Sequence, residues 1–179
     1  MATNPWYVLT GAPSSGKSTL LNELSGRGYK TVKEAARYEI ERQVAAGEDF
    51  QKLRANASEF QHRVLRLKLE WEAKLPKDEV VFFDRGIPDS VAYYINEGIP
   101  EDEFLHDALQ KCSYRKIFIL DLISKENFIH DGARSETWEG AVELDALLET
   151  AYRNLGYQVE RVPVMSVAER ADFVLVRLD

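Results

Sequence analysis

Two glycines, two serines and a lysine occur near the N-terminus in a spacing that suits phosphate chemistry. The pattern G-x-x-x-x-G-K-[ST] is matched by Gly11-Ala12-Pro13-Ser14-Ser15-Gly16-Lys17-Ser18, directly after the apolar run Trp6–Thr10. The glycines let the backbone turn tightly, so that successive N–H groups surround a phosphate at the start of a helix. Lys17 can reach the outer phosphates, and the Ser18 hydroxyl can bind a magnesium ion that bridges them. We therefore predict that this loop, continued by Thr19, binds ATP and Mg²⁺.

An acidic residue follows the third apolar segment, which reads Val80-Val81-Phe82-Phe83 and ends at Asp84-Arg85-Gly86. In an open parallel sheet, a side chain at the carboxyl end of a strand faces the crevice where ligands bind. Asp84 could hold the magnesium ion with Ser18, accept a proton from an attacking hydroxyl group, or do both. The alternative is structural, because Asp84 could instead cap a helix or pair with Arg85.

The second apolar segment is followed by Glu34, in the stretch Thr31-Val32-Lys33-Glu34-Ala35-Ala36-Arg37. By the same geometry its carboxylate faces the crevice, where it could orient or deprotonate an acceptor hydroxyl. Arg37 lies one helical turn later and could pair with an acceptor phosphate or with Glu34 itself. A glutamate in the first turn of a helix also stabilises the helix dipole without any chemistry, so both interpretations of Glu34 stay open.

A polar stretch, 127–137, follows the fourth apolar segment and contains Arg134. Phosphoryl transfer needs positive charge on the oxygens of the group in transit, and a closing loop that delivers an arginine also excludes water. We predict that residues 124–137 form a lid and that Arg134 is its catalytic arginine. The alternative is an arginine that is simply solvated on a polar loop.

Five short apolar segments must position these residues, and most have the character of a buried strand. They are nearly continuous in Val, Ile, Phe and Leu instead of alternating with polar residues, as expected for strands covered on both faces. Helical patterns separate them, which predicts an α/β fold with a parallel sheet. The five predicted strands are 6–10, 29–33, 79–83, 116–121 and 157–162.

The segment 34–75 is longer than a plain crossover between two strands requires, and it predicts a helical insertion on the acceptor side of the sheet. Ser58 and Gln61 have the spacing of a capping box at the start of one of its helices. Ser166 and Glu169 repeat that spacing before a C-terminal helix.

The composition excludes several classes of protein. A net charge of -7 in 179 residues argues against a broad nucleic-acid interface, which needs a basic stripe. A single cysteine excludes an internal disulfide and a cysteine-based metal cluster, and no apolar run is long enough for a transmembrane helix. These features predict one cytoplasmic domain, 1–179.

One basic cluster, Arg63, Arg66 and Lys68, lies within the predicted helical insertion. Glu70 and Glu72 follow it at once, and this mixture of charges is typical of a solvated helix face. We therefore do not expect nucleic acid as a partner.

With these residues assembled, the chain resembles a small P-loop kinase. It is similar to the family of short predicted AAA-type ATPases that also includes the ribosylnicotinamide kinase domain, and more distantly to thymidylate and deoxynucleoside kinases. The resemblance covers nearly the whole chain, although only the phosphate loop is specific by itself. The further segments that carry it are Glu34-Ala35-Ala36-Arg37, Asp84-Arg85-Gly86-Ile87-Pro88-Asp89-Ser90, Asp131-Gly132-Ala133-Arg134 and Val162-Pro163-Val164-Met165-Ser166-Val167-Ala168-Glu169-Arg170.

The resemblance implies a P-loop NTPase fold, with five parallel strands in the order 2-3-1-4-5, helices on both faces and a helical lid and acceptor subdomain. It implies that Asp84 and Arg85 form the acidic–arginine pair of the acceptor side and that Arg134 is the lid arginine. It also implies that the segment after Val162 lines the purine base. The presence of one lid arginine, where nucleotide kinases commonly have several, favours an acceptor without a phosphate of its own.

The leading interpretation is an ATP- and Mg²⁺-dependent kinase that moves the γ-phosphoryl group to a small hydroxyl acceptor, such as a nucleoside or a ribosyl-nicotinamide-like molecule. The alternative is a nucleotide-dependent ATPase or GTPase switch that acts through a protein or phosphoinositide partner. A guanine-specific GTPase should carry the motif Asn-Lys-x-Asp, which is absent from the sequence. The identity of the acceptor, the choice between ATP and GTP and the oligomeric state stay open at this point.

Overall fold

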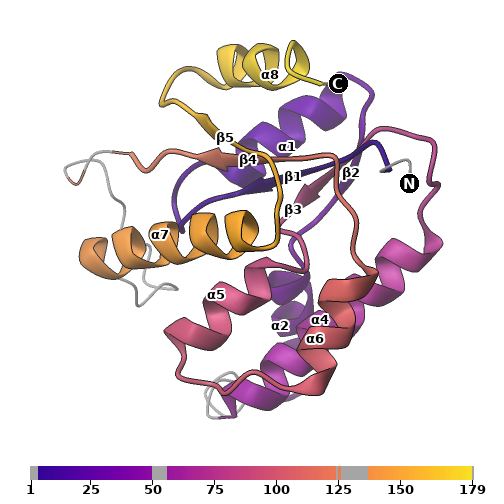
Figure 1. Ribbon diagram of the computed structural model, residues 1–179, viewed down its shortest axis with the longest axis vertical. Coiled ribbons are helices and arrows are strands. Elements are labelled where there is room, and N and C mark those ends of the chain that lie inside the picture. The colour runs from indigo at the N-terminus through magenta and orange to yellow at the C-terminus, as the bar shows by residue number, and fades with distance from the viewer. Residues whose placement is uncertain (1–3, 50–55, 124, 126–136, 179) are drawn as a thin grey trace.

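A five-stranded parallel sheet forms the centre of the computed structural model (Figure 1). The structure describes residues 4–49, 56–123, 125 and 137–178. The strand order β2-β3-β1-β4-β5 and the parallel pairing of all neighbours confirm the predicted arrangement. The strands are β1 (Trp6–Thr10), β2 (Lys30–Val32), β3 (Val81–Asp84), β4 (Lys116–Leu120) and β5 (Val159–Val162).

Helices cover both faces of this sheet because alternate side chains of each strand enter different cores. On β1, Tyr7 and Leu9 pack with leucines of α1, whereas Trp6 and Val8 pack with Tyr152 of α7 on the opposite face. Figure 1 shows the same layers, with α1 and α8 on one side of the sheet and α5 and α7 on the other. These helices are α1 (Lys17–Gly26), α5 (Asp89–Asn96), α7 (Trp138–Asn154) and α8 (Val167–Leu175).

The predicted insertion between the second and third strands is helical. It contains α2 (Ala35–Ala45) and α4 (Ala57–Lys74), and α6 (Glu103–Lys111) packs against α4. Figure 1 shows α2, α4 and α6 gathered below the sheet, next to α5. An apolar cluster between α4, α5 and α6 is separate from the two cores of the sheet and contains Leu65, Ile87, Tyr94, Leu105 and Ala108.

The helix starts agree only partly with the sequence pattern. The predicted capping box at Ser58 and Gln61 is wrong, because the Asn56 side chain caps α4 by accepting from the Glu59 N–H at 3.2 Å. Gln61 instead faces inward and bonds to Glu97. Near the C-terminus the predicted capping box of Ser166 and Glu169 is confirmed, with both reciprocal bonds present.

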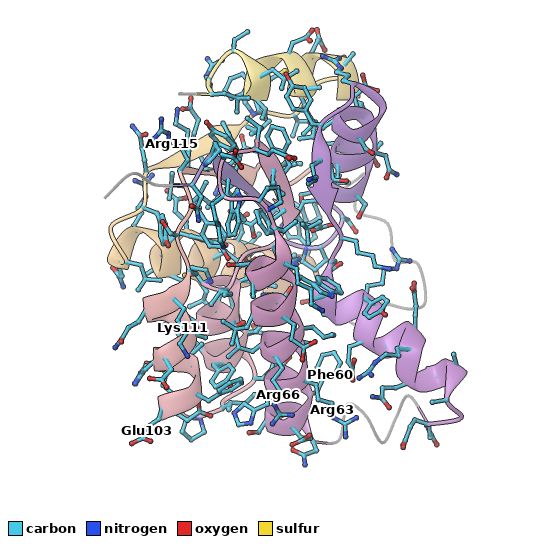
Figure 2. All side chains as sticks on the ribbon, turned by 90° about the vertical axis from the view of Figure 1, so that its right-hand side faces the viewer. Phe60, Arg63, Arg66, Glu103, Lys111 and Arg115 are labelled. Carbon is cyan, nitrogen blue, oxygen red and sulfur yellow. The ribbon has the colours of Figure 1, made fainter. Side chains whose placement is uncertain are left out.

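The charged residues of α4 do not form one solvated face as predicted. Arg66 is exposed, as Figure 2 shows, and Glu70 is exposed as well. Lys68 and Glu72, by contrast, are each only 7% exposed, because they share the inward stripe with Val64. Two ionisable side chains are therefore buried between the helical insertion and the sheet.

No helix in the described parts of the chain is both long and apolar enough to cross a membrane.

A substitution at Leu24 of α1 tests the core that positions the phosphate loop. It is fully buried among side chains of β1, β4 and α8. Leu24→Ala should lower the free energy of unfolding by about 2–5 kcal/mol, because the leucine loses apolar burial and leaves a cavity. Urea denaturation measures the change, and Val142→Ala, at a position that is 44% exposed on α7, is the control. Equal losses in the two variants would contradict this description of the core.

Candidate active site

The predicted phosphate loop connects β1 to α1, in the strand–loop–helix order that its motif requires. Gly16 is the N-cap of α1 with φ 89°, and Ser14 also has a positive φ, 65°. The first N–H groups of a helix have no partners within it, and the helix dipole adds positive potential at this end. The loop therefore presents backbone donors to an anion.

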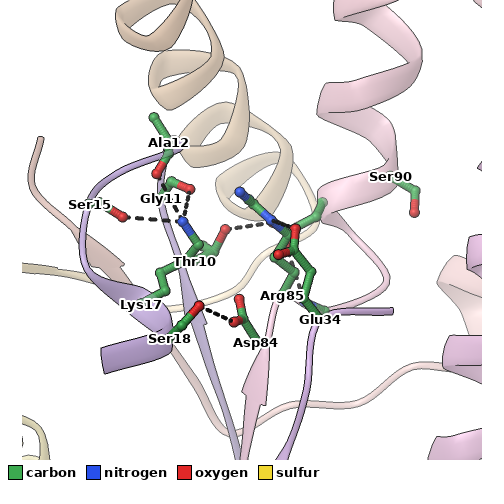
Figure 3. Close-up of polar contacts among 12 residues, drawn as sticks. Thr10, Gly11, Ala12, Ser15, Lys17, Ser18, Glu34, Asp84, Arg85 and Ser90 are labelled. Carbon is green, nitrogen blue, oxygen red and sulfur yellow. Dashed lines mark hydrogen bonds and ion pairs between the residues drawn. The ribbon is translucent and has the colours of Figure 1, made fainter. Parts of the chain in front are cut away.

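The Lys17 ammonium lies across this loop (Figure 3). Its hydrogen bonds go to Gly11 O at 2.9 Å, Ala12 O at 2.9 Å and Ser15 Oγ at 3.2 Å. Burial, and then repulsion by Arg85, lowers the pKa of Lys17 to about 8, although nearby carboxylates act in the opposite direction. An anion beside a buried ammonium favours its charged form, so a bound phosphate would raise this pKa again.

Ser18 and Asp84 meet beside the loop, with Ser18 Oγ donating to Asp84 Oδ2 at 3.4 Å (Figure 3). The second carboxylate oxygen, Asp84 Oδ1, is buried and has no hydrogen-bond partner in the described part of the protein. Burial and the charge of Glu34 raise the pKa of Asp84 to about 6. Mg²⁺ commonly takes one or two protein oxygens and completes its shell with water and phosphates. The hydroxyl and the unpaired carboxylate oxygen fit such a site.

Arg85 is held between two carboxylates. Its Nε donates to Glu34 Oε1 at 3.1 Å, and its NH1 donates to Asp89 Oδ1 at 3.1 Å. Burial opposes the charge of the guanidinium, but Tyr93, Glu34 and Asp89 raise the pKa of Arg85 well above its usual value. For Glu34, burial acts upward, yet the attraction of Arg85 and Lys17 lowers its pKa overall. Glu34 and Arg85 therefore form a charged pair.

Asp89 organises the turn after β3. It is fully buried at the start of α5, and its two oxygens accept from four donors. These donors are Thr10 Oγ1 at 2.6 Å, Arg85 NH1 at 3.1 Å, Gly86 N at 2.9 Å and the Tyr152 hydroxyl. One side chain thus joins β1, the turn, α5 and α7.

The backbone of this turn is under steric restriction. Arg85 has φ 67°, a left-handed conformation that side chains other than glycine seldom adopt and that costs about 1–3 kcal/mol. At the next residue, a Cβ atom on Gly86 would lie 2.8 Å from the Tyr152 hydroxyl and 3.0 Å from the Tyr114 ring. The tyrosines therefore require glycine at position 86, and they hold the chain where Arg85 reaches Glu34.

Lys68 and Glu72, the buried pair on α4, support the same turn through hydrogen bonds. Lys68 Nζ donates to Gly86 O at 2.7 Å, and the Tyr114 hydroxyl donates to Glu72 while accepting from Ile87 N at 2.9 Å. Burial lowers the pKa of Lys68. Burial also raises the pKa of Glu72 to about 7, although its bond from Tyr114 and the charge of Lys68 limit the shift. The insertion thus fixes the turn after β3 through hydrogen bonds to and near its backbone.

The structure brings Lys17, Ser18, Glu34, Asp84 and Arg85 together at the carboxyl edge of the sheet, as the sequence predicts. Glu34 is the N-cap of α2, but its side chain makes no capping bond and turns to Arg85 instead. Arg85 pairs with Glu34 and Asp89, whereas Asp84 bonds to Ser18.

Two further arginines, Arg37 and Arg134, were predicted from the sequence to act in the site. Arg37 pairs with Glu41 at 3.3 Å on the exposed face of α2 and does not pair with Glu34 as one interpretation allowed. Arg134, and with it nearly all of the predicted lid at 124–137, lies outside the described residues.

Sequence reasoning missed the buried partners Lys68, Glu72, Asp89, Tyr114 and Tyr152. A signal for Lys68 and Glu72 was present, because both fall on the apolar stripe of α4 at helical spacing. The tyrosines had no local signal, since they reach the turn from segments 27 and 66 residues away.

A pocket of about 190 Å³ opens beside the Ser18–Asp84 pair, between α1 and α2. Its wall includes Glu34 and Tyr38. Pockets for drug-sized ligands commonly measure about 300–1,000 Å³. This space, which Asp84 also lines, is therefore the size of a hydrated ion or one small group.

The phosphate loop at the end of β1, in a parallel sheet of this order, defines a P-loop NTPase fold. A family model described as an AAA domain matches residues 6–170, and the chain belongs to that family. No curated protein sequence matches the chain significantly.

Solved structures of kinases share the fold at low sequence identity. Thymidylate kinase from Ehrlichia chaffeensis is 15% identical, with a TM-score of 0.66 over 97% of this chain and 98% of that one. Deoxyadenosine kinase from M. mycoides with bound dATP is 17% identical, with a TM-score of 0.67 over 97% and 98% of the two chains. NadR protein in complex with NR is 15% identical, with a TM-score of 0.69, and the match covers 97% of this chain but 50% of NadR.

Glu72 makes the stability of the protein depend on pH. Its folded-state pKa of about 7 lies above the ordinary 4.5, so the folded state retains a proton that the unfolded state releases. The contribution of Glu72 is therefore fully present below about pH 4.5 and falls by about 3 kcal/mol as the pH rises to 7. Glu72→Gln should remove this fall.

Urea denaturation between pH 4.5 and 8 measures the Glu72 effect as the difference from wild type, because other groups titrate in both proteins. Glu70→Gln, at an exposed position of the same helix, should keep the wild-type slope. A Glu72→Gln protein with the wild-type slope would refute the assignment.

Proposed function

We propose that the protein is an ATP- and Mg²⁺-dependent kinase that transfers the γ-phosphoryl group to a hydroxyl of a small, nucleoside-like acceptor. One observation carries the proposal: a carboxylate with an unpaired buried oxygen, Asp84, lies between the phosphate loop and the Glu34–Arg85 pair. The loop supplies the phosphate donor side, and the charged pair supplies an acceptor side at the same edge of the sheet.

On the donor side, the chain binds and orients the triphosphate. The N–H groups at the start of α1 would donate to the β-phosphate, and Lys17 would exchange its carbonyl partners for phosphate oxygens. Ser18 and Asp84 would hold Mg²⁺, which supplies charge neutralisation and orientation of the phosphates when bound. A bound phosphate would supply the negative charge that the buried Lys17 ammonium lacks among its neutral oxygen partners.

On the acceptor side, the two carboxylates differ in their tendency to take a proton. The pKa of Asp84 is raised to about 6, whereas the pKa of Glu34 is lowered by Arg85. Glu34 is held in its ion pair with Arg85, whereas Asp84 Oδ1 accepts no hydrogen bond from the described residues, which favours Asp84 over Glu34 as the general base. The acceptor oxygen would attack the γ-phosphorus, its proton would pass to Asp84, and the bond to the β-phosphate oxygen would break to release ADP. Arg85, and Arg134 from the lid, would stabilise charge on the transferred group.

The class of acceptor rests on the comparisons and on the sequence. The structural neighbours are described as thymidylate kinase, deoxyadenosine kinase and NadR in complex with NR, which supports an acceptor of the nucleoside or nucleotide class. The single arginine in the lid sequence supports an acceptor without a phosphate.

The first test is ADP release from Mg²⁺-ATP with a panel of acceptors: nucleosides, nicotinamide riboside, nucleoside monophosphates and inositol lipids. We expect a nucleoside or nicotinamide riboside to stimulate release, and Lys17→Ala to abolish it because the outer phosphates lose their cation. Slow release that no acceptor stimulates would argue against a kinase and for a nucleotide-dependent switch.

Asp84→Asn tests the shared role of this carboxylate. Acceptor-stimulated turnover should fall about 10²- to 10⁴-fold, because the amide cannot take the proton. Asp78→Asn, at an exposed position before β3, is the control. Full turnover in Asp84→Asn would eliminate the assignment.

A further inference from the structure

Arg170 of α8 has no assigned role in the phosphate site, although its guanidinium touches the loop. NH1 donates to Ser15 O at 2.7 Å. A Cβ atom on Gly16 would lie 2.8 Å from the same nitrogen, so the guanidinium packs directly against the glycine backbone. The contact joins residues 155 positions apart and ties α8 to the start of α1.

The charge of Arg170 is buried without a matching anion. The residue is 6% exposed, and burial lowers the pKa of its guanidinium. Asp121 acts on it through space, but that carboxylate makes its ion pair with Arg161 at 2.7 Å. In the described part of the chain, Arg170 Nε has no hydrogen-bond partner, and Arg170 forms no ion pair. Buried charges are usually paired, so an uncompensated arginine beside an anion-binding loop points to the anion as its counter-charge.

The bond to Ser15 also sets the direction of the next N–H group. The peptide between Ser15 and Gly16 is trans, and in a planar trans peptide the carbonyl and the N–H point in opposite directions. Arg170 draws the Ser15 carbonyl toward α8, which turns the Gly16 N–H away from α8 and toward the loop. A carbonyl oxygen facing a phosphate would repel it, whereas an N–H group attracts it.

We propose that Arg170 is a positioning residue of the nucleotide site: it fixes the Ser15–Gly16 peptide with its N–H toward the β-phosphate and adds positive charge beside the phosphate loop. This inference rests on the proposed nucleotide-binding function and deepens it. The chemistry that it recognises is a diphosphate group, independent of the base.

The experiment compares Arg170→Met with Arg27→Met. Arg27 ties α1 to the same helix from the outside, through Asp172 at 2.5 Å and Ala168 O at 3.3 Å, so its loss loosens the same helix pair without touching the loop. Calorimetry measures the affinity of each protein for ADP and for inorganic pyrophosphate. Melting temperature and hydrogen exchange of the loop amides are recorded in parallel.

Arg170→Met should weaken ADP and pyrophosphate by a similar factor, about 10- to 100-fold, as expected for loss of a hydrogen bond from a charged group. It should also raise the rate of hydrogen exchange of the Gly16 amide. Arg27→Met should leave both affinities unchanged, even where its melting temperature falls. Arg170→Lys keeps the positive charge but lacks the planar guanidinium group, so its affinity should lie between those of wild type and Arg170→Met. This variant provides the test if Arg170→Met does not fold.

Equal affinity losses in Arg170→Met and Arg27→Met would overturn the proposal, because Arg170 would then act only through helix packing. Unchanged affinities in Arg170→Met, or in a folded Arg170→Lys that replaces it, would overturn it as well. Lys17→Ala distinguishes a failure of the proposed function from a failure of the role of Arg170: if the loop binds phosphate, wild type binds pyrophosphate more tightly than this variant. If wild type and Lys17→Ala bind equally poorly, the proposed function fails and the role of Arg170 fails with it.

Discussion

The burial of Arg85 is the constraint on which the rest of the site depends. A buried guanidinium is tolerated only where carboxylates and hydrogen bonds replace the water that it loses. Glu34 and Asp89 provide those carboxylates, and Asp89 is itself fixed by Thr10, Gly86 N and Tyr152. Because these partners come from β1, α2, α5 and α7, the requirement to compensate one charge aligns the elements around the carboxyl edge of the sheet.

The same network stores backbone strain where the chemistry is proposed. Arg85 keeps a left-handed conformation because Gly86 and Ile87 are bonded on several sides, by Tyr152, Tyr114 and Lys68. Strained residues persist where their surroundings determine them from more than one direction. The turn therefore holds the guanidinium in place before any substrate arrives, which limits the reorganisation that binding requires.

The electrostatic environment gives different pKa values to the two carboxylates nearest the phosphate loop. Asp84 is buried near another negative charge and has a raised pKa, whereas Glu34 is next to Arg85 and has a lowered one. Pairs of titratable groups whose environments push their pKa values apart are typical of sites that move protons. The fold alone does not identify the activity, since one fold supports many activities and function depends on the site.

The sheet, the phosphate loop and the positions of Glu34 and Asp84 could be predicted from the amino-acid sequence, because these features depend on local patterns. Buried parallel strands are continuous in apolar residues, and residues that follow such strands meet at one edge. Three features depend on contacts between distant segments and required the folded structure: the partners of Arg85, the burial of Lys68 and Glu72, and the contact of Arg170 with the loop. A charged residue on a helix is ordinarily solvated, and only the packing of distant elements shows which charges lose their water and must be compensated.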